Sequence, residues 1–195
     1  MPEHDVRQKM NPVDTSYLVA RFVVGDAAPE ELVEWAISCM QDGLESRTLP
    51  IVAGYTKVEL SNDTGDFRND VTRLFKEFEI SLPSMNAARE WFARYLCEGI
   101  IGDSLCPDSA HFELYELWRE SNYQPELEYQ PRLDPFMYLS DSLGLVEMGE
   151  VPVVNGLTSE NYHDFLKKEC RIYLEAEKPM LCEQAVPPKS DRAGG

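Results

Sequence analysis

Residues 29–43 read PEELVEWAISCMQDG, and this stretch decides the fold class. Apolar side chains recur there three and four positions apart, at Leu32, Trp35, Ala36, Cys39 and Met40. Residues with this spacing share one face of an α-helix, so the pattern predicts an amphipathic helix that buries that face. Pro29 suits the first turn of such a helix, and Gly43 suits its left-handed termination.

The residues that precede this helix leave one question open. Asp26 is the expected N-terminal cap, because its side chain can accept a hydrogen bond from a free backbone N–H of the first turn. Residues 15–24 are rich in Val and Phe, and their periodicity does not distinguish a strand from a short buried helix. The helical neighbours favour a helix.

The same helical spacing of apolar residues occurs clearly in two later stretches. Residues 67–78 carry an apolar stripe opposite charged side chains, and residues 88–96 repeat the arrangement. Pro83 marks the break between the two, and Ser84 is the expected cap of the second helix. Two strong amphipathic helices in succession favour packing of helix against helix.

Two weaker helices complete the first two thirds of the chain. Ser46 can cap a short helix that tolerates Pro50 only near its start and ends at Gly54. A later helix opens at Asp108 or Ser109 and carries its apolar side chains inward at Ala110, Leu114, Leu117 and Trp118.

Residues 122–156 differ from the rest because proline and glycine interrupt them repeatedly. Such residues oppose long regular elements, so we predict irregular connections with short helical turns, one of them at 136–143. A last helix is expected to start after Thr158 or Ser159.

These patterns predict an all-α fold, a compact multi-helix array with an irregular Pro- and aromatic-rich segment and a C-terminal helix. The chain has 195 residues, 43% of them hydrophobic, which suits one ordinary core. We predict a flexible lead over 1–13, a single helical domain over 14–178 and a disordered tail over 179–195.

Charge is the most unusual global property. Eighteen Lys and Arg stand against thirty-five Asp and Glu, a net charge of −17. This field repels nucleic acid and anionic membranes and attracts basic proteins. The simplest interpretation is that the charge only keeps the protein in solution.

Cysteine use and hydropathy indicate a cytoplasmic protein. The five cysteines are odd in number, widely spaced and without a CxxC pair, unlike a secreted disulfide framework. Residues 1–10 are polar and do not resemble a signal peptide. No stretch reaches the ~20 apolar residues that span a bilayer, so no membrane association is expected. The oligomeric state stays open.

The sequence offers little catalytic or ligand chemistry. Metal sites need clustered ligands, and the three histidines are scattered, at His4, His111 and His163. No glycine-rich phosphate loop occurs, and no cofactor is expected.

One set of residues could provide a thiol nucleophile, a histidine base and an orienting acid. It joins Cys97 or Cys106 to His111 and Glu113. A cysteine on an apolar face is more often inert packing, and His111, in the first turn of a helix, is expected to be exposed. We therefore expect no enzyme, although a cysteine-dependent one remains an alternative.

A stretch of alternating aromatic and acidic residues is the candidate binding site. Carboxylates attract a basic partner, and rigid aromatic side chains anchor it. The competing interpretation is that the aromatic residues close the core. The candidate residues are Tyr123, Glu126, Glu128, Tyr129, Asp134, Tyr138 and Asp141.

A resemblance extends over about residues 28–130. Trp35-Ala36, Gly43, Ser46, Leu49 and Ala53-Gly54, then Trp91-Phe92-Ala93, Tyr95, Trp118, Tyr123 and Pro125, resemble a pattern of uncharacterised bacterial proteins. Some of these proteins accompany polymorphic toxins as immunity proteins. Val52 and Tyr55 depart from the pattern, which more often has Leu at both places. The resemblance implies a helical array and carries no catalytic residues.

The leading hypothesis is therefore a non-catalytic acidic protein that binds a basic protein, for example an immunity protein that neutralises a basic toxin. The alternative is a helical adaptor or regulatory protein whose charge serves only solubility and whose partner occupies an apolar groove.

Overall fold

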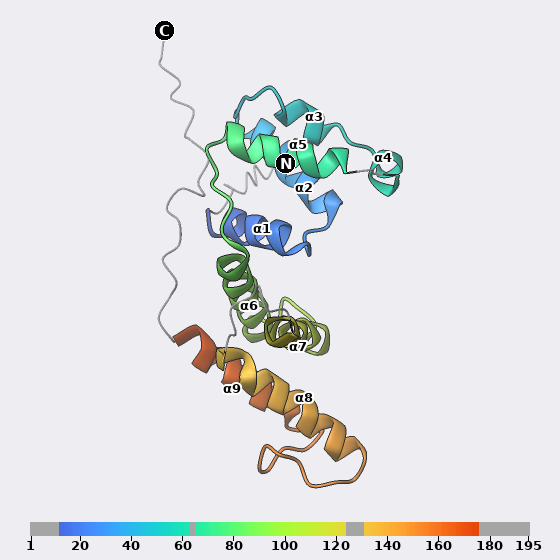
Figure 1. The fold of residues 1–195 in the computed structure, drawn as a ribbon, viewed down its shortest axis with the longest axis vertical. Coiled ribbons are helices and arrows are strands. Elements are labelled where there is room, and N and C mark those ends of the chain that lie inside the picture. Colours follow the sequence, from blue (N-terminus) through green and yellow to red (C-terminus); the bar gives the residue numbers. More distant parts are fainter. Residues whose placement is uncertain (1–11, 63–64, 124–130, 176–195) are drawn as a thin grey trace, which may run out of the picture. The chain divides into compact units, whose positions relative to one another are not determined.

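Helices dominate the computed structural model, which describes residues 12–62, 65–123 and 131–175. These residues form nine α-helices, one short 3-10 helix and no β-strand (Figure 1). The predicted all-α fold of packed helices is confirmed.

The described residues fall into two compact units, one ending at Pro83 and the other starting at Ser84. We call residues 12–83 the N-terminal unit and residues 84–175 the C-terminal unit. The single domain predicted over 14–178 stays a prediction. The predicted tail over 179–195 lies outside the described residues, as does the predicted lead except for residues 12 and 13, which begin the first helix.

The N-terminal unit contains five helices: α1 (Pro12–Val24), α2 (Pro29–Gln41), α3 (Leu49–Ala53), α4 (Lys57–Ser61) and α5 (Asp66–Glu77). Residues 15–24 belong to α1, which settles the choice between strand and helix in favour of helix. The sequence analysis did not predict α4, which begins with a capping box of Thr56 and Glu59.

Arg21 determines how α2 begins. The predicted cap at Asp26 is wrong, because Ala28 is the N-cap and its N–H donates to the Glu31 carboxylate over 3.0 Å. Asp26 instead accepts a bond from Arg21 Nε at 2.7 Å, and Arg21 Nη2 donates to Glu31 at 2.9 Å. The Asp26 carboxylate is therefore engaged with Arg21, and Glu31 accepts the N–H at the start of α2. Met40, predicted to face inward, is 46% exposed.

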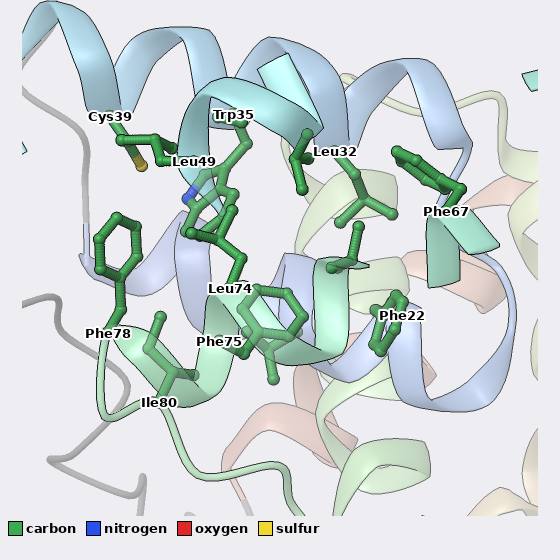
Figure 2. Packing of buried hydrophobic residues seen from close by; sticks show 14 residues of the cluster. Phe22, Leu32, Trp35, Cys39, Leu49, Phe67, Leu74, Phe75, Phe78 and Ile80 are labelled. Atoms are coloured by element: carbon green, nitrogen blue, oxygen red, sulfur yellow. The ribbon is translucent and has the colours of Figure 1, made fainter. Parts of the chain in front are cut away.

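Aromatic rings fill the core of the N-terminal unit (Figure 2). Phe75 of α5 is fully buried, and its ring lies 5.3 Å from that of Phe22 and 5.4 Å from that of Trp35. Phe78 also contacts Trp35, at 6.1 Å between ring centroids. The stripes predicted on α2 and α5 therefore meet in one core, which α1 completes.

A carboxylate holds the start of α3. Glu77 accepts bonds from the N–H and the hydroxyl of Thr48, at 2.9 and 2.6 Å. Thr48 is the N-cap rather than the predicted Ser46, whose hydroxyl still accepts the Leu49 N–H at 3.1 Å. The end of α5 is thereby tied to the beginning of α3.

The C-terminal unit contains α6 (Met85–Ile101), α7 (Pro107–Tyr123), the 3-10 helix η1 (Pro131–Leu133), α8 (Asp134–Glu147) and α9 (Tyr162–Glu175). Helix α6 packs on α7 and α9, while α8 packs on α7 and α9 (Figure 1). Ser84 caps α6, as predicted. The last helix starts at Tyr162, a few residues after its expected start.

Helix α8 is longer than the short turns predicted at 136–143. Its fourteen residues include Pro135, which lies in the first turn where a missing N–H costs nothing, and Gly144, which the helix accommodates. The prediction was wrong because both residues were interpreted as helix breakers.

Two arginines bind carbonyl oxygens in the last turn of α9. Arg94 of α6 is 6% exposed and donates to the Leu174 carbonyl at 3.0 Å. Arg132 of η1 donates to the Tyr173 carbonyl at 2.7 Å. The last carbonyls of a helix lack partners within it and carry partial negative charge, so two guanidinium groups are suited to this position.

Candidate functional site

The conceivable thiol and histidine pair does not assemble as a nucleophile and base. Cys97 is fully buried, and burial raises the pKa of its thiol. Cys106 is exposed, and a hydrogen bond from the Ser109 backbone lowers its pKa. Both ring nitrogens of His111, however, bond elsewhere.

His111 is buried, at 5% exposure, which corrects the prediction that it is exposed. Its Nε2 lies 2.8 Å from the Phe136 carbonyl, which only accepts, so Nε2 carries the hydrogen. Nδ1 is therefore the acceptor of the Tyr162 hydroxyl. Burial lowers the pKa of His111, in agreement with a neutral ring. The histidine joins α7 to α8 and α9 and is not free to take a proton from a thiol.

Over the residues described by the structure, no group of three or more His, Cys, Asp or Glu could hold a metal ion. Over the same residues, no helix is long and apolar enough to cross a membrane.

The predicted partner-binding residues fall into two sets. Glu126, Glu128 and Tyr129 lie outside the described residues. Tyr123 is the last residue of α7 and is 74% exposed, and Asp134, Tyr138 and Asp141 all lie on α8.

The three residues on α8 share one face of the helix. They recur at intervals of four and three, and the same spacing continues through Leu145 to Met148 just after the helix. Tyr138 is 45% exposed and Met148 71%. The buried residues Phe136, Leu139 and Ser142 occupy the opposite face. We call the set Asp134, Tyr138, Asp141, Leu145 and Met148 the α8 outer face.

Aromatic side chains of α7 adjoin one end of the α8 outer face. Trp118 Nε1 donates to Asp134 Oδ1 at 2.9 Å, which fixes the carboxylate. The rings of Trp118 and Tyr115 lie 5.8 Å apart at 33°. Carboxylates and aromatic side chains therefore adjoin one another at this end of the face.

The stretch of sequence that carries the α8 outer face has charges of one sign only. Residues 133–166 hold six Asp and Glu and no Lys or Arg. The whole C-terminal unit holds seventeen acidic residues against seven Lys and Arg, and two of the seven, Arg89 and Arg94, are buried. Its exposed surface is therefore more negative than its composition suggests.

The sequence pattern did not mark three exposed apolar residues that lie at the end of α8 and in the loop after it. They are Met148, 71% exposed, Val151, 87% exposed, and Val153, 63% exposed. The four-and-three spacing from Tyr138 reaches Met148, but the helix was expected to end at 143. The two valines have no periodic signal because they lie in a loop.

A separate hollow of about 800 Å³ lies in the N-terminal unit, along α5 and residues 79–82. Polar side chains of α5, among them Asn69, Arg73 and Lys76, line it together with Ile80 and Leu82. None of the predicted site residues contributes to it.

Comparison with known proteins gives no relative from which a function could be transferred. The chain matches no family model, no curated protein and no solved structure.

Proposed function

We propose that this chain is a non-catalytic cytoplasmic protein that binds a basic protein partner through the α8 outer face. One observation carries the proposal: Tyr138 lies half-exposed between Asp134 and Asp141 within a 34-residue stretch, 133–166, that contains no Lys or Arg. We expect the exposed Asp141 carboxylate to pair with a Lys or Arg side chain of the partner.

Charge and aromatic groups have different roles in this proposal. The negative C-terminal unit raises the association rate, because it attracts a basic protein before contact. Tyr138 and the side chains beside it slow dissociation, because an aromatic residue buried at an interface excludes water from its surroundings.

The biological role we propose is that of an immunity protein, which neutralises a basic toxin by binding it one to one. The sequence pattern of residues 28–130, which resembles uncharacterised proteins some of which accompany toxins, motivates this role, as does the acidic charge that suits a basic partner. The test is coexpression with the product of the neighbouring gene. Protection of growth is expected, and growth arrest despite coexpression would contradict the immunity role.

The electrostatic part is tested with Asp141→Asn against the control Glu34→Gln, an exposed carboxylate on α2. The association rate of the same gene product is measured at 50 mM and 300 mM salt. We expect Asp141→Asn to slow association by about threefold at low salt, with little effect of the control. An association rate independent of salt would favour the alternative adaptor, whose charge serves only solubility.

A further inference from the structure

We infer that the loop Met148–Val153 is the apolar anchor that holds a basic partner on the C-terminal unit. The inference rests on the proposed function, which it extends by assigning slow dissociation to particular side chains. We call these six residues the α8 loop; they follow α8 directly, in the orange connection toward α9 (Figure 1).

Three side chains of the α8 loop are apolar and face water: Met148, Val151 and Val153, exposed by 71%, 87% and 63%. Removing such side chains from water is favourable, so a partner that covers them forms a more stable complex. Glu147 and Glu150 are both exposed and flank the first of them. Apolar contact and negative charge are thus combined within a few residues.

The α8 loop is fixed at its start by the termination of α8. Gly149 has φ +76°, and its N–H donates to the Val146 carbonyl at 3.0 Å. The Glu150 N–H donates to the Leu145 carbonyl at 2.8 Å. This pair of bonds is the usual closure of a helix by a left-handed glycine, and it sets the direction in which the chain leaves α8.

The end of the α8 loop is fixed as well. The Val154 N–H donates to the hydroxyl of Ser142 at 2.8 Å, and Ser142 is fully buried. Leu157 follows with 3% exposure, so the chain returns to the core at once. Pro152 restricts the backbone between these two fixed ends of the loop. Binding therefore orders little backbone, which favours affinity.

Charge selects the occupant of the α8 loop. A second copy of this chain would bring the six carboxylates of residues 133–166 against six others, with no Lys or Arg in either stretch. A basic protein with a shallow apolar socket matches both the charge and the exposed valines. The occupant we assign is therefore such a protein.

The experiment uses the whole chain and a defined probe, a synthetic helical peptide with Lys on one face and Leu on the other. Its dissociation rate is measured for wild type, for the double variant Val151→Ser/Val153→Ser, and for the control Val58→Ser. Val58 is a comparable valine, 70% exposed on α4 of the N-terminal unit. A second peptide with Ser in place of Leu measures attraction by charge alone.

We expect the double variant to release the Lys/Leu peptide about tenfold faster, with an unchanged association rate and an unchanged melting temperature. Val58→Ser should behave as wild type, and the Lys/Ser peptide should leave wild type and variant equally fast. Equal release of the Lys/Leu peptide by wild type and double variant would overturn the anchor but leave the proposed function intact. If wild type binds neither peptide at low salt, both are overturned. Self-association that the double variant abolishes would overturn the assignment of a basic occupant.

Discussion

The two units bury different kinds of side chain. Besides Thr15, Ser16 and Thr48, the buried residues of the N-terminal unit are apolar, and aromatic rings around Phe75 form their centre. In the C-terminal unit the buried polar residues are Arg89, Arg94, His111, Ser121 and Ser142. Apolar packing depends little on pH, whereas a buried polar group has to keep its hydrogen bonds and its protonation state. We therefore expect the stability of the two units to depend differently on core substitutions and on pH.

The largest effect should come from the aromatic core. Phe75→Ala removes a fully buried ring that packs on Phe22 and Trp35, and we expect a loss of about 4 kcal/mol in the free energy of unfolding. Denaturant unfolding measures the loss, and hydrogen exchange locates it in residues 12–83. Phe75→Leu is the control and should cost less, because it leaves a smaller cavity. A loss below 1 kcal/mol would show that this core does not hold the unit.

The second effect concerns the buried guanidinium of Arg89. It is 2% exposed and donates to the Leu117 carbonyl and to Glu120, so Arg89→Ala leaves a cavity and removes the cation that pairs with Glu120. We expect a loss of about 3 kcal/mol, with faster hydrogen exchange in α6 and α7.

The control for Arg89 is Arg119→Ala, which breaks an exposed pair with Glu116 on the same helix and should cost less than about 0.5 kcal/mol. Similar losses for the two arginine variants would show that the buried Arg89 contributes no more stability than an exposed ion pair.

The third effect is a pH dependence of the unfolding free energy that arises from His111 in the C-terminal unit. Because burial lowers the pKa of His111, the unfolded chain takes up a proton near the ordinary value of 6.5 while the folded chain does not. Stability from this group is therefore complete above about pH 7 and falls as pH drops below 6.5, by up to about 1.4 kcal/mol per pH unit.

The variant His111→Gln can keep the bond to Phe136 and does not titrate. It should be less stable than wild type at pH 7, yet its unfolding free energy should change less between pH 7 and pH 5.5. Chemical unfolding at both values gives the comparison. A pH profile parallel to that of wild type would contradict a neutral, buried His111.

The smallest effect belongs to the carboxylate that holds α3. Desolvation raises the pKa of Glu77, but the bonds from Thr48 outweigh it and the pKa is lowered overall. The stability it contributes is present above about pH 4.5 and is lost as pH falls through the lowered value. Glu77→Gln should cost less than about 1 kcal/mol at pH 7 and nothing in strong acid, as measured by urea unfolding. Equal losses at both pH values would contradict an ionised cap.

Patterns in the sequence predicted the features that neighbouring residues determine, namely the positions of the strong helices and one N-cap. The stripes of α2, α5 and α6 follow from apolar spacing alone, and Ser84 caps its helix as expected. Asp26 failed as a cap because Arg21, five residues earlier, competes for its carboxylate.

What the sequence could not reveal depends on partners far along the chain. The Leu174 carbonyl, 80 residues away, accepts a bond from Arg94, and the Tyr162 hydroxyl, 51 residues away, bonds to His111. Of the candidate site, the residues on α8 share the face that their spacing implies. The exposed valines of the α8 loop were invisible, because they depend on where α8 ends and the loop begins.

The two guanidinium groups at the end of α9 set a limit on how far the chain can be shortened. A stop codon after Glu175 keeps the Tyr173 and Leu174 carbonyls that Arg132 and Arg94 bind. A stop codon two residues earlier deletes one acceptor and places a terminal carboxylate at the other. An affinity tag should therefore be joined beyond residue 175, and truncation within the last helical turn should be avoided.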